Sequence, residues 1–195
     1  MRRSSDGRDY FVKVAIAGAP NSGKLTILDF IGKRYGALPP REHQIGDLRI
    51  HRSGWTDYDL LGDGRALHVS LVTLHGKVPY NAAEELLVRE ADGVVFVMDV
   101  APSRLKEAWE ALLRVSDNTQ RNGYELRSIP LALQYHRADH HPNFEPAKLD
   151  AWLGVPTGSV PRYVTSSSSP DLEGMAFDSV LGQIKKRLAD LGAVA

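Results

Sequence analysis

Short apolar runs alternate with amphipathic stretches along most of this chain. The runs that predict β-strands are Phe11–Ala17, Trp55–Leu61, Ala66–Leu74, Gly93–Val100, Ile129–Tyr135 and Arg162–Thr165. The stretches that predict helices are Lys24–Lys33, a segment around residues 105–113, Pro146–Leu153 and a last segment around residues 177–191. Strands that alternate with helices in this way predict an α/β fold, with a mostly parallel central sheet and helices on both faces.

Three segments carry the clearest patterns. The run GVVFVMDV, residues 93–100, is almost entirely apolar, which is typical of a strand buried on both faces. The strands 55–61 and 66–74 flank Gly62-Asp63-Gly64, so we expect an antiparallel hairpin within the sheet. Apolar side chains at helical spacing predict two core-facing stripes: Leu105, Ala108, Trp109, Leu112 and Leu113, and then Phe177, Leu181, Ile184, Leu188 and Leu191.

The length and composition point to one ordinary domain. A chain of 195 residues supplies one good core; we expect a single domain over residues 10–192 after a flexible N-terminus, residues 1–9. Lys plus Arg equals Asp plus Glu, 24 each, so no overall field favours nucleic acid. The absence of cysteine excludes disulfides and thiolate chemistry. No apolar stretch resembles a signal peptide or a membrane span, so we expect a cytoplasmic protein with no integral membrane segment.

The strongest chemical motif is GAPNSGKLT, residues 18–26, directly after the first predicted strand. Its first seven residues fit the phosphate-loop pattern G-x-x-x-x-G-K. Gly18 and Gly23 let successive backbone N–H groups point inward at phosphate, and the helix that follows directs its positive end there. Lys24 adds a cation for the outer phosphates. Asn21 and Ser22 belong to the same predicted phosphate-binding loop.

The motif departs from the pattern at its eighth position. A Ser or Thr hydroxyl normally holds magnesium there, but this chain has Leu25, and Thr26 comes one residue later. One step along a helix rotates a side chain by about 100°. The Thr26 hydroxyl is therefore expected to point elsewhere, and the sequence predicts a metal-poor site.

At this point the chain resembles the MglA-type bacterial Ras-like GTPases, known for cell polarity and gliding motility, over about residues 10–190. The segments that carry the resemblance are VREADGVVFVMDV, the run Asn122 to Leu126, Ile129-Pro130 and Gln134-Tyr135. The resemblance implies a P-loop Ras-like domain that binds GTP and GDP with Mg²⁺, although Leu25 replaces the usual hydroxyl ligand.

The resemblance also implies a guanine-recognition loop. The stretch His136-Arg137-Ala138-Asp139 stands where the family usually has Asn-Lys-x-Asp. Asp139 would accept two hydrogen bonds from the guanine edge, which adenine does not offer. Arg137 would lay its stem under the base, and His136 replaces the Asn that ties this loop to the phosphate loop. Ser166 and Ser167 stand in the family's last base-contacting loop.

The family's switch regions are altered as well. Gly76 corresponds to the residue whose N–H meets the γ-phosphate, while Lys77 replaces the glutamine that orients the attacking water. Lys77 has donors but no acceptor. His51-Arg52-Ser53 aligns with the family's Asp-Arg-Thr, so Arg52 would be a catalytic arginine supplied in cis and Ser53 a weak magnesium ligand.

Three functions remain open from the sequence. The leading one is a guanine-nucleotide switch with slow or impaired GTP hydrolysis, and the alternative is a pseudo-GTPase that serves as an interaction module without nucleotide. A P-loop kinase or ATPase would need an acidic residue near the loop, where we expect Asp99 to have a capping role instead. The resemblance implies one partner, a roadblock-fold MglB-like regulator homodimer. It would contact the surface around residues 51–53 and 76–80, with Trp55 as a nearby anchor.

Overall fold

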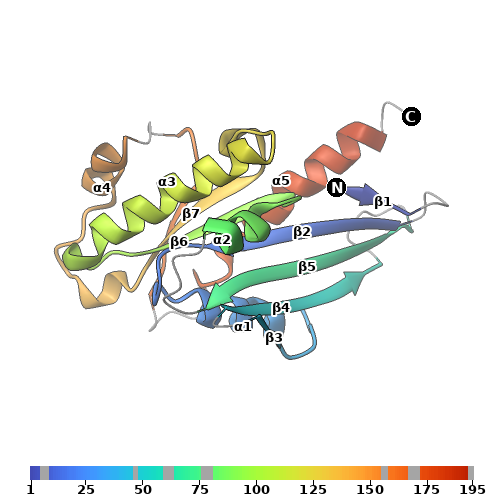
Figure 1. Cartoon of the computed structure of the whole chain (residues 1–195), viewed down its shortest axis with the longest axis horizontal. Helices are drawn as coiled ribbons and strands as arrows, with labels where there is room; N and C mark the ends of the chain where they lie inside the picture. Colours follow the sequence, from blue (N-terminus) through green and yellow to red (C-terminus); the bar gives the residue numbers. More distant parts are fainter. Residues whose placement is uncertain are drawn as a thin grey trace.

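The computed structural model describes residues 1–4, 9–45, 48–58, 64–75, 81–154, 158–166 and 172–192. Eight strands of these ranges form one sheet, in the order β3-β4-β5-β2-β6-β7-β8 with β1 on β2 (Figure 1). The strands are β1 (Arg2–Arg3), β2 (Asp9–Ala17), β3 (Arg41–Ile45), β4 (Leu48–Asp57), β5 (Ala66–His75), β6 (Gly93–Asp99), β7 (Leu131–His136) and β8 (Arg162–Val164).

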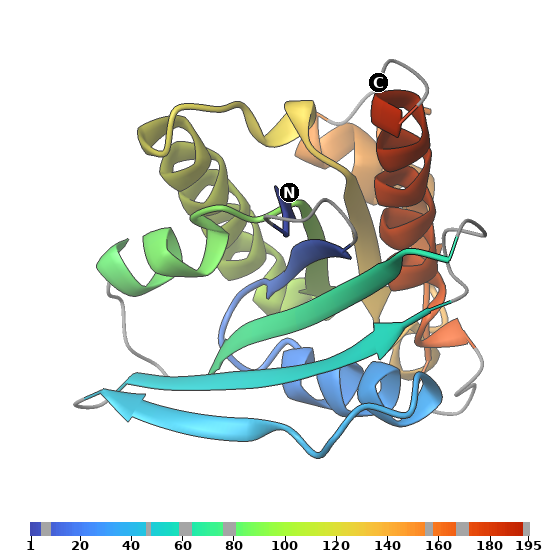
Figure 2. The same cartoon turned by 90° about the vertical axis from the view of Figure 1, so that its right-hand side faces the viewer.

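Helices cover both faces of this sheet, as the alternating pattern predicted. They are α1 (Lys24–Arg34), α2 (Asn81–Val88), α3 (Leu105–Arg121), α4 (Pro146–Leu153) and α5 (Met175–Gly192). Figure 2 shows α2 and α3 on one side of the strands and α1 and α5 on the other. In the described part of the chain, no helix combines the length and the apolar character that crossing a bilayer requires.

The strand directions confirm the mostly parallel sheet. Strand β2 runs parallel to β5 and β6, and β6, β7 and β8 continue in the same direction. The predicted hairpin is present as β4 and β5, although β4 begins at Leu48, seven residues before the expected start. Strands β1 and β3 add further antiparallel pairs. Strand β1 lies within the segment that we expected to be flexible.

Two apolar clusters fill the space between the sheet and its helices. One lies under α2, α3 and α4, and the other lies under α1 and α5. Every residue of β6 is buried, which confirms the pattern read from GVVFVMDV. At Gly93 a Cβ would lie 2.5 Å from the Val180 side chain of α5, so this glycine allows the close approach of helix and strand.

The predicted helix faces are correct in part. In α5, Phe177, Leu181, Ile184 and Leu188 are buried, whereas Leu191 in the last turn is exposed. Leu113 of α3 is 44% exposed, whereas the buried positions of this helix are small or medium residues: Ala108, Ala111, Val115, Asn118 and Thr119. Small side chains let α3 pack closely against the sheet, and its buried face is therefore rotated from the leucine-rich one that we predicted.

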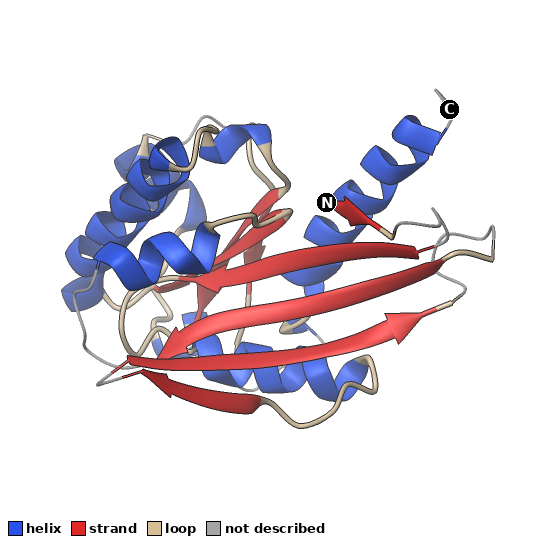
Figure 3. Cartoon of the chain, turned by 45° about the vertical axis from the view of Figure 1, so that its right-hand side comes forward, coloured by secondary structure: helices blue, strands red, loops and turns tan. Residues whose placement is uncertain are grey.

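Helix α2 leaves part of its sheet face open. Its 8 residues span about 12 Å, whereas the 10 residues of β5 span about 33 Å. Figure 3 shows β2, β4 and β5 extending well past this helix. On this face Ala15, Val72 and Leu74 belong to or pack on the core cluster, but Lys13 and Ser70 one step along β2 and β5 do not.

Candidate functional site

The motif GAPNSGKLT forms a tight loop between the end of β2 and the start of α1. Gly18, Asn21 and Gly23 have φ values of 145°, 58° and 96°, in the region that favours glycine. A Cβ at Gly18 would lie 2.1 Å from the carbonyl oxygen of Val97 on β6. The loop therefore requires glycine at position 18 for both conformation and space.

The inside of the loop has features of an anion site. The Ser22 side chain is buried, and in the described ranges its hydroxyl has no hydrogen-bond partner. Gly23 begins α1 without a side-chain cap, and the first turn of α1 carries no acidic residue. The free N–H groups and the positive end of this 11-residue helix therefore face the loop, and no acidic side chain of the first turn offsets their positive charge.

Lys24 forms a hydrogen bond within the loop. Its ammonium donates a hydrogen bond of 2.6 Å to the carbonyl oxygen of Ala19, and the side chain is buried. Burial is the main reason why the pKa of Lys24 is lowered to about 8; Glu84 and Glu107 oppose the shift, and the positive charge of Arg104 adds to it. Near neutral pH the loop thus holds a cation that burial makes costly and that an anionic ligand would stabilise.

Leu25 and Thr26 lie beside each other at the mouth of the loop. A pocket of about 150 Å³ is bounded by residues 20–26, Leu74, His75 and Arg137. Leu25 is half-buried and Thr26 is exposed. The magnesium position of the motif is therefore occupied by an apolar side chain that offers no ligand.

The loop after β7 packs directly on the phosphate-type loop. A Cβ at Gly23 would lie 2.5 Å from Cδ2 of His136, so the imidazole rests against the glycine. Arg137, with a φ of 62°, donates hydrogen bonds to the carbonyl oxygen of Asn21 at 3.2 Å and to Asp99 at 2.7 Å. Asp99 also accepts the N–H of Ala101 at 3.0 Å, so it has a structural role in the turn after β6.

A buried polar cluster lies beneath this junction. Gln134 donates to the Thr165 hydroxyl and to Glu173, each at 3.1 Å. Nδ1 of His136 lies 3.3 Å from the Thr165 hydroxyl and 3.4 Å from the Glu173 carboxyl group. Burial raises the pKa of Glu173 to about 7, with a further contribution from Asp139. Burial, followed by the charge of Arg137, lowers the pKa of His136, so its imidazole is neutral at neutral pH.

The raised pKa of Glu173 predicts a pH-dependent stability. A carboxyl group whose pKa is higher in the folded state binds more protons there, so its ionisation opposes folding as the pH rises from about 4.5 to about 7. Glu173→Gln removes this cost. Compared with the parent protein, the variant should gain roughly 2–3 kcal/mol in the free energy of unfolding between pH 5 and pH 8. Urea denaturation of both proteins at the two pH values measures this gain.

The matched control is Glu125→Gln, at an exposed glutamate in the segment after α3. Its difference from the parent protein should stay constant between pH 5 and pH 8. If Glu173→Gln also shows a constant difference, Glu173 is ionised in the folded state throughout this range and the interpretation is wrong.

Two further predicted base-binding residues, Asp139 and Ser166, lie at the same edge of the sheet. Asp139 is in the 3₁₀ turn Ala138–His140, with its carboxylate 3.7 Å from Nε2 of His140. The N–H of Ala138 donates to the carbonyl oxygen of Thr165, so the loops after β7 and β8 are joined. Ser166 follows this contact and is half-buried. Ser167, Gly76 and Lys77 lie outside the described residues.

The structure does not bring Arg52 and Ser53 to the loop. Arg52 pairs with Val72 in the middle of β5, is exposed, and lines a groove on the open sheet face. The buried Ser53 hydroxyl donates to the carbonyl oxygen of Leu38 at 3.2 Å. It packs on Gly32, eight residues and about 12 Å along α1 from the loop lysine. Ser53 is thus a buried packing residue here.

Trp55 is likewise part of the interior. Its ring stacks on Tyr35, with centroids 4.6 Å apart, and meets the edge of Phe177 at 5.7 Å. It is half-buried and packs on the cluster under α1 and α5. Trp55 thus has a role in packing, and its role as a partner anchor stays a prediction.

Sequence reasoning missed the charged residues around Lys24. Arg104, just before α3, donates to the carbonyl oxygen of Pro20 in the loop and pairs with Glu107 at 2.9 Å. Glu84 of α2 pairs with Arg114 of α3, also at 2.9 Å. These groups line or adjoin a cavity of about 280 Å³ that also contacts Gly18 and Lys24. The one signal in the sequence for Arg104 is its place in the segment that follows the apolar strand β6, at the edge of the sheet that holds the loop.

The described geometry combines a glycine loop at a helix N-terminus with the loops that follow the parallel strands β7 and β8. No protein-family model matches the chain. The chain is 38% identical over 136 residues to the mutual gliding-motility protein MglA of Myxococcus xanthus (strain DK1622), a match that covers 68% of this chain and 70% of the relative. Identity of this level over more than two thirds of both chains, together with the fold, shows that the chain belongs to the MglA family of Ras-like small GTPases.

Proposed function

We propose that this protein binds GDP and GTP at the edge of the sheet where β2, β7 and β8 end, and that it hydrolyses GTP slowly. The observation that carries the proposal is the direct packing of the two loops, with His136 on Gly23 and Arg137 on Asn21. The phosphates would lie in the loop 18–24. The base would lie against Arg137 and Asp139, with Ser166 and Ser167 beside it.

The loop residues fit a phosphate group. The buried, unpartnered hydroxyl of Ser22 offers a donor, and the uncapped start of α1 offers backbone N–H groups. Bound phosphate would also give Lys24 a partner better than the neutral carbonyl of Ala19, because hydrogen bonds between charged groups are the stronger ones. These three features support phosphate binding without reference to the sequence motif.

The same residues do not fit magnesium in the family's usual way. Leu25 supplies no oxygen, and the Asp99 carboxylate is engaged by Arg137 and by the N–H of Ala101. We therefore propose that nucleotide is held with little help from the metal. Slow hydrolysis follows from the missing glutamine at Lys77 and from the position of Arg52, so that a partner would have to supply part of the catalytic machinery.

The partner in this proposal is an MglB-like roadblock homodimer, and the compartment is the cytoplasm. The surface that binds this partner would include residues 51–53 of β4 and residues 76–80, which lie outside the described ranges. Co-purification of the GTP-loaded protein with an MglB-like homodimer, and acceleration of GTP hydrolysis by that dimer, would support this part of the proposal.

The first test is a titration of nucleotide-stripped protein with fluorescent GDP, GTP and ATP analogues, each with magnesium and with EDTA. We expect guanine-selective binding that differs by less than about twofold between magnesium and EDTA. In Leu25→Thr the restored hydroxyl should make affinity for GDP about tenfold tighter with magnesium than with EDTA. Leu25→Ala, which lacks the hydroxyl, is the matched control and should remain insensitive to the metal.

The alternative function is a pseudo-GTPase that serves as an interaction module. It is favoured by the hydrogen bond between Lys24 and Ala19, which lets the loop satisfy its own lysine without a ligand. In that case none of the nucleotides binds, and none of them raises the melting temperature. Fast turnover of GTP by the isolated protein would instead contradict the slow hydrolysis proposed above.

A further inference from the structure

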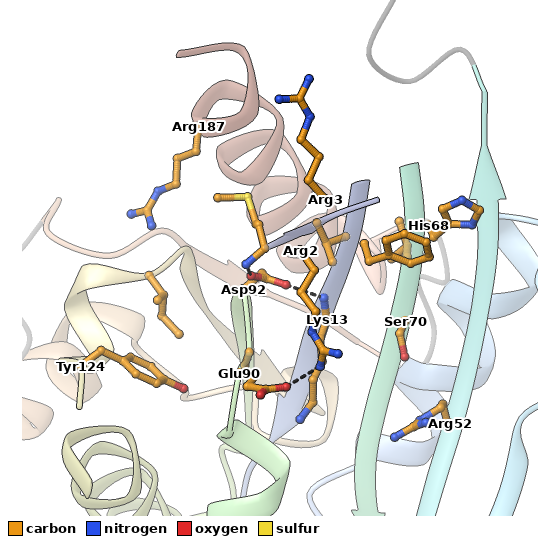
Figure 4. Close-up of a pocket in the computed structure, with 16 residues that line it drawn as sticks. Arg2, Arg3, Lys13, Arg52, His68, Ser70, Glu90, Asp92, Tyr124 and Arg187 are labelled. Atoms are coloured by element: carbon orange, nitrogen blue, oxygen red, sulfur yellow. Dashed lines mark hydrogen bonds and ion pairs between the residues drawn. The ribbon is translucent and has the colours of Figure 1, made fainter. Parts of the chain in front are cut away.

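The open face of the sheet forms a broad groove at the end remote from the phosphate-type loop. We call it the basal groove; its volume is about 1060 Å³, and its lining includes Phe11, Lys13, Arg52, His68, Ser70 and Arg187 (Figure 4). Phe11 precedes Gly18 by seven residues, so the two sites are about 23 Å apart along β2. The groove exists because α2 is too short to cover this half of the sheet.

Cationic side chains surround the basal groove. Arg2, Arg3, Lys13, Arg52 and Arg187 line it, against only Glu90 and Asp92 as acidic lining residues. Both acids are engaged, Glu90 by Arg2 and Asp92 by the backbone N–H of Lys13 at 2.8 Å. Within the described part of the chain, neither Arg52 nor Arg187 forms an ion pair with a carboxylate. A protein with equal numbers of acidic and basic residues thus concentrates positive charge here.

Lys13 strengthens this positive character at the centre of the groove. Its ammonium donates to the carbonyl oxygens of Leu86 and Arg89 at the end of α2, at 3.0 and 2.7 Å. Burial lowers the pKa of Lys13 to about 8, and the next contribution is the positive charge of Arg52. The two cations therefore destabilise each other, a cost that a negatively charged ligand would relieve.

The floor of the groove offers apolar surface as well. Phe11 is 44% exposed and stacks on the His68 ring, with centroids 4.5 Å apart and planes 9° from parallel. Ile129 also lines the groove and is half-buried. Figure 4 shows His68 on one side of the groove and Tyr124 and Arg187 on the other, with Lys13 between them.

We propose that the basal groove docks an acidic, amphipathic segment of a partner protein. An apolar floor between cationic walls is complementary to a segment whose apolar side chains alternate with carboxylates, and such complementarity favours encounter and orientation. The volume exceeds that of most small-molecule pockets, which favours a polypeptide. The proposal does not depend on nucleotide binding.

The test is selection of a displayed library of random peptides on the purified full-length protein, followed by fluorescence anisotropy with the enriched peptides. Enriched sequences should be rich in Asp and Glu with interspersed apolar residues, and raised salt should weaken their binding. Arg52→Glu combined with Arg187→Glu should weaken binding by at least about tenfold. Lys186→Glu, an exposed neighbour of Arg187 that does not line the groove, is the matched control and should change binding by less than about twofold.

A second variant tests the contribution of the apolar floor of the basal groove to peptide binding. Phe11→Ala keeps every charge and should weaken the same peptides by about three- to tenfold, because their apolar residues lose the Phe11 ring. The proposal is overturned if the selected peptides are not acidic, or if the double variant binds them as well as the parent protein does. It is also overturned if vesicles of phosphatidylserine bind and no peptide does. Circular dichroism verifies that each variant is folded.

Discussion

Lys24→Ala should lower the affinity for GDP and GTP by roughly 30- to 100-fold. The substitution removes the buried cation that would contact the outer phosphates, and hydrogen bonds to charged groups contribute about 1.5–3 kcal/mol each. The affinity of the parent protein should also fall as the pH rises through about 8, where Lys24 loses its proton. The variant should lack this decline. Titration of stripped protein with a fluorescent GDP analogue across pH 6.5 to 9 measures both effects.

The matched control for this experiment is Lys33→Ala. Lys33 lies on the same helix, is exposed and pairs with Asp29 at 2.6 Å, far from the loop. Its removal should leave nucleotide affinity unchanged. Should Lys24→Ala bind GDP as tightly as the parent protein, the loop would not be the phosphate site.

Asp139→Ala should reduce the preference for guanine over adenine nucleotides by about 100-fold or more. A site that pairs a carboxylate with the guanine edge discriminates strongly, because the wrong base leaves that carboxylate unpaired. Without the carboxylate, GDP binds more weakly and ADP no longer meets the same penalty. The measurement is the ratio of the Kd values for GDP and ADP in both proteins.

Asp117→Ala serves as the control here, since Asp117 is an exposed residue of α3 outside the candidate site. It should preserve the ratio of the parent protein. A preserved ratio in Asp139→Ala would assign base selection to other groups, and the neutral His136 with its Thr165 and Glu173 contacts would be the next to test.

The central elements could be predicted because their patterns are local. The run 93–100 is apolar throughout, and the loop glycines directly follow a strand, so β6, the loop and α1 appear where expected. We predicted the wrong buried face for α3 because leucine indicates a core-facing position more strongly than alanine does. At a tightly packed helix, however, small residues face the sheet.

The positions of the candidate site residues on β4 could not be predicted, because this strand has no clear pattern of its own. The strand LRIHRSGWTD mixes charged, polar and glycine residues, so its start and register are set by pairing with β5 rather than by its own pattern. We predicted the positions of Arg52 and Ser53 from a motif alignment alone, and that prediction was wrong. The cluster of Gln134, Thr165 and Glu173 unites three distant segments, and no local signal in the sequence connects them.

The two hydrogen bonds of Arg137, to Asn21 and to Asp99, also affect how the candidate site can open. One guanidinium joins the phosphate-type loop through Asn21, the end of β6 through Asp99, and its own loop after β7. Segments that share such a side chain tend to unfold locally as one cooperative unit. Opening for ligand release therefore requires these contacts to break together, so exchange of a bound ligand would be governed by one concerted fluctuation rather than by independent movements of the loops.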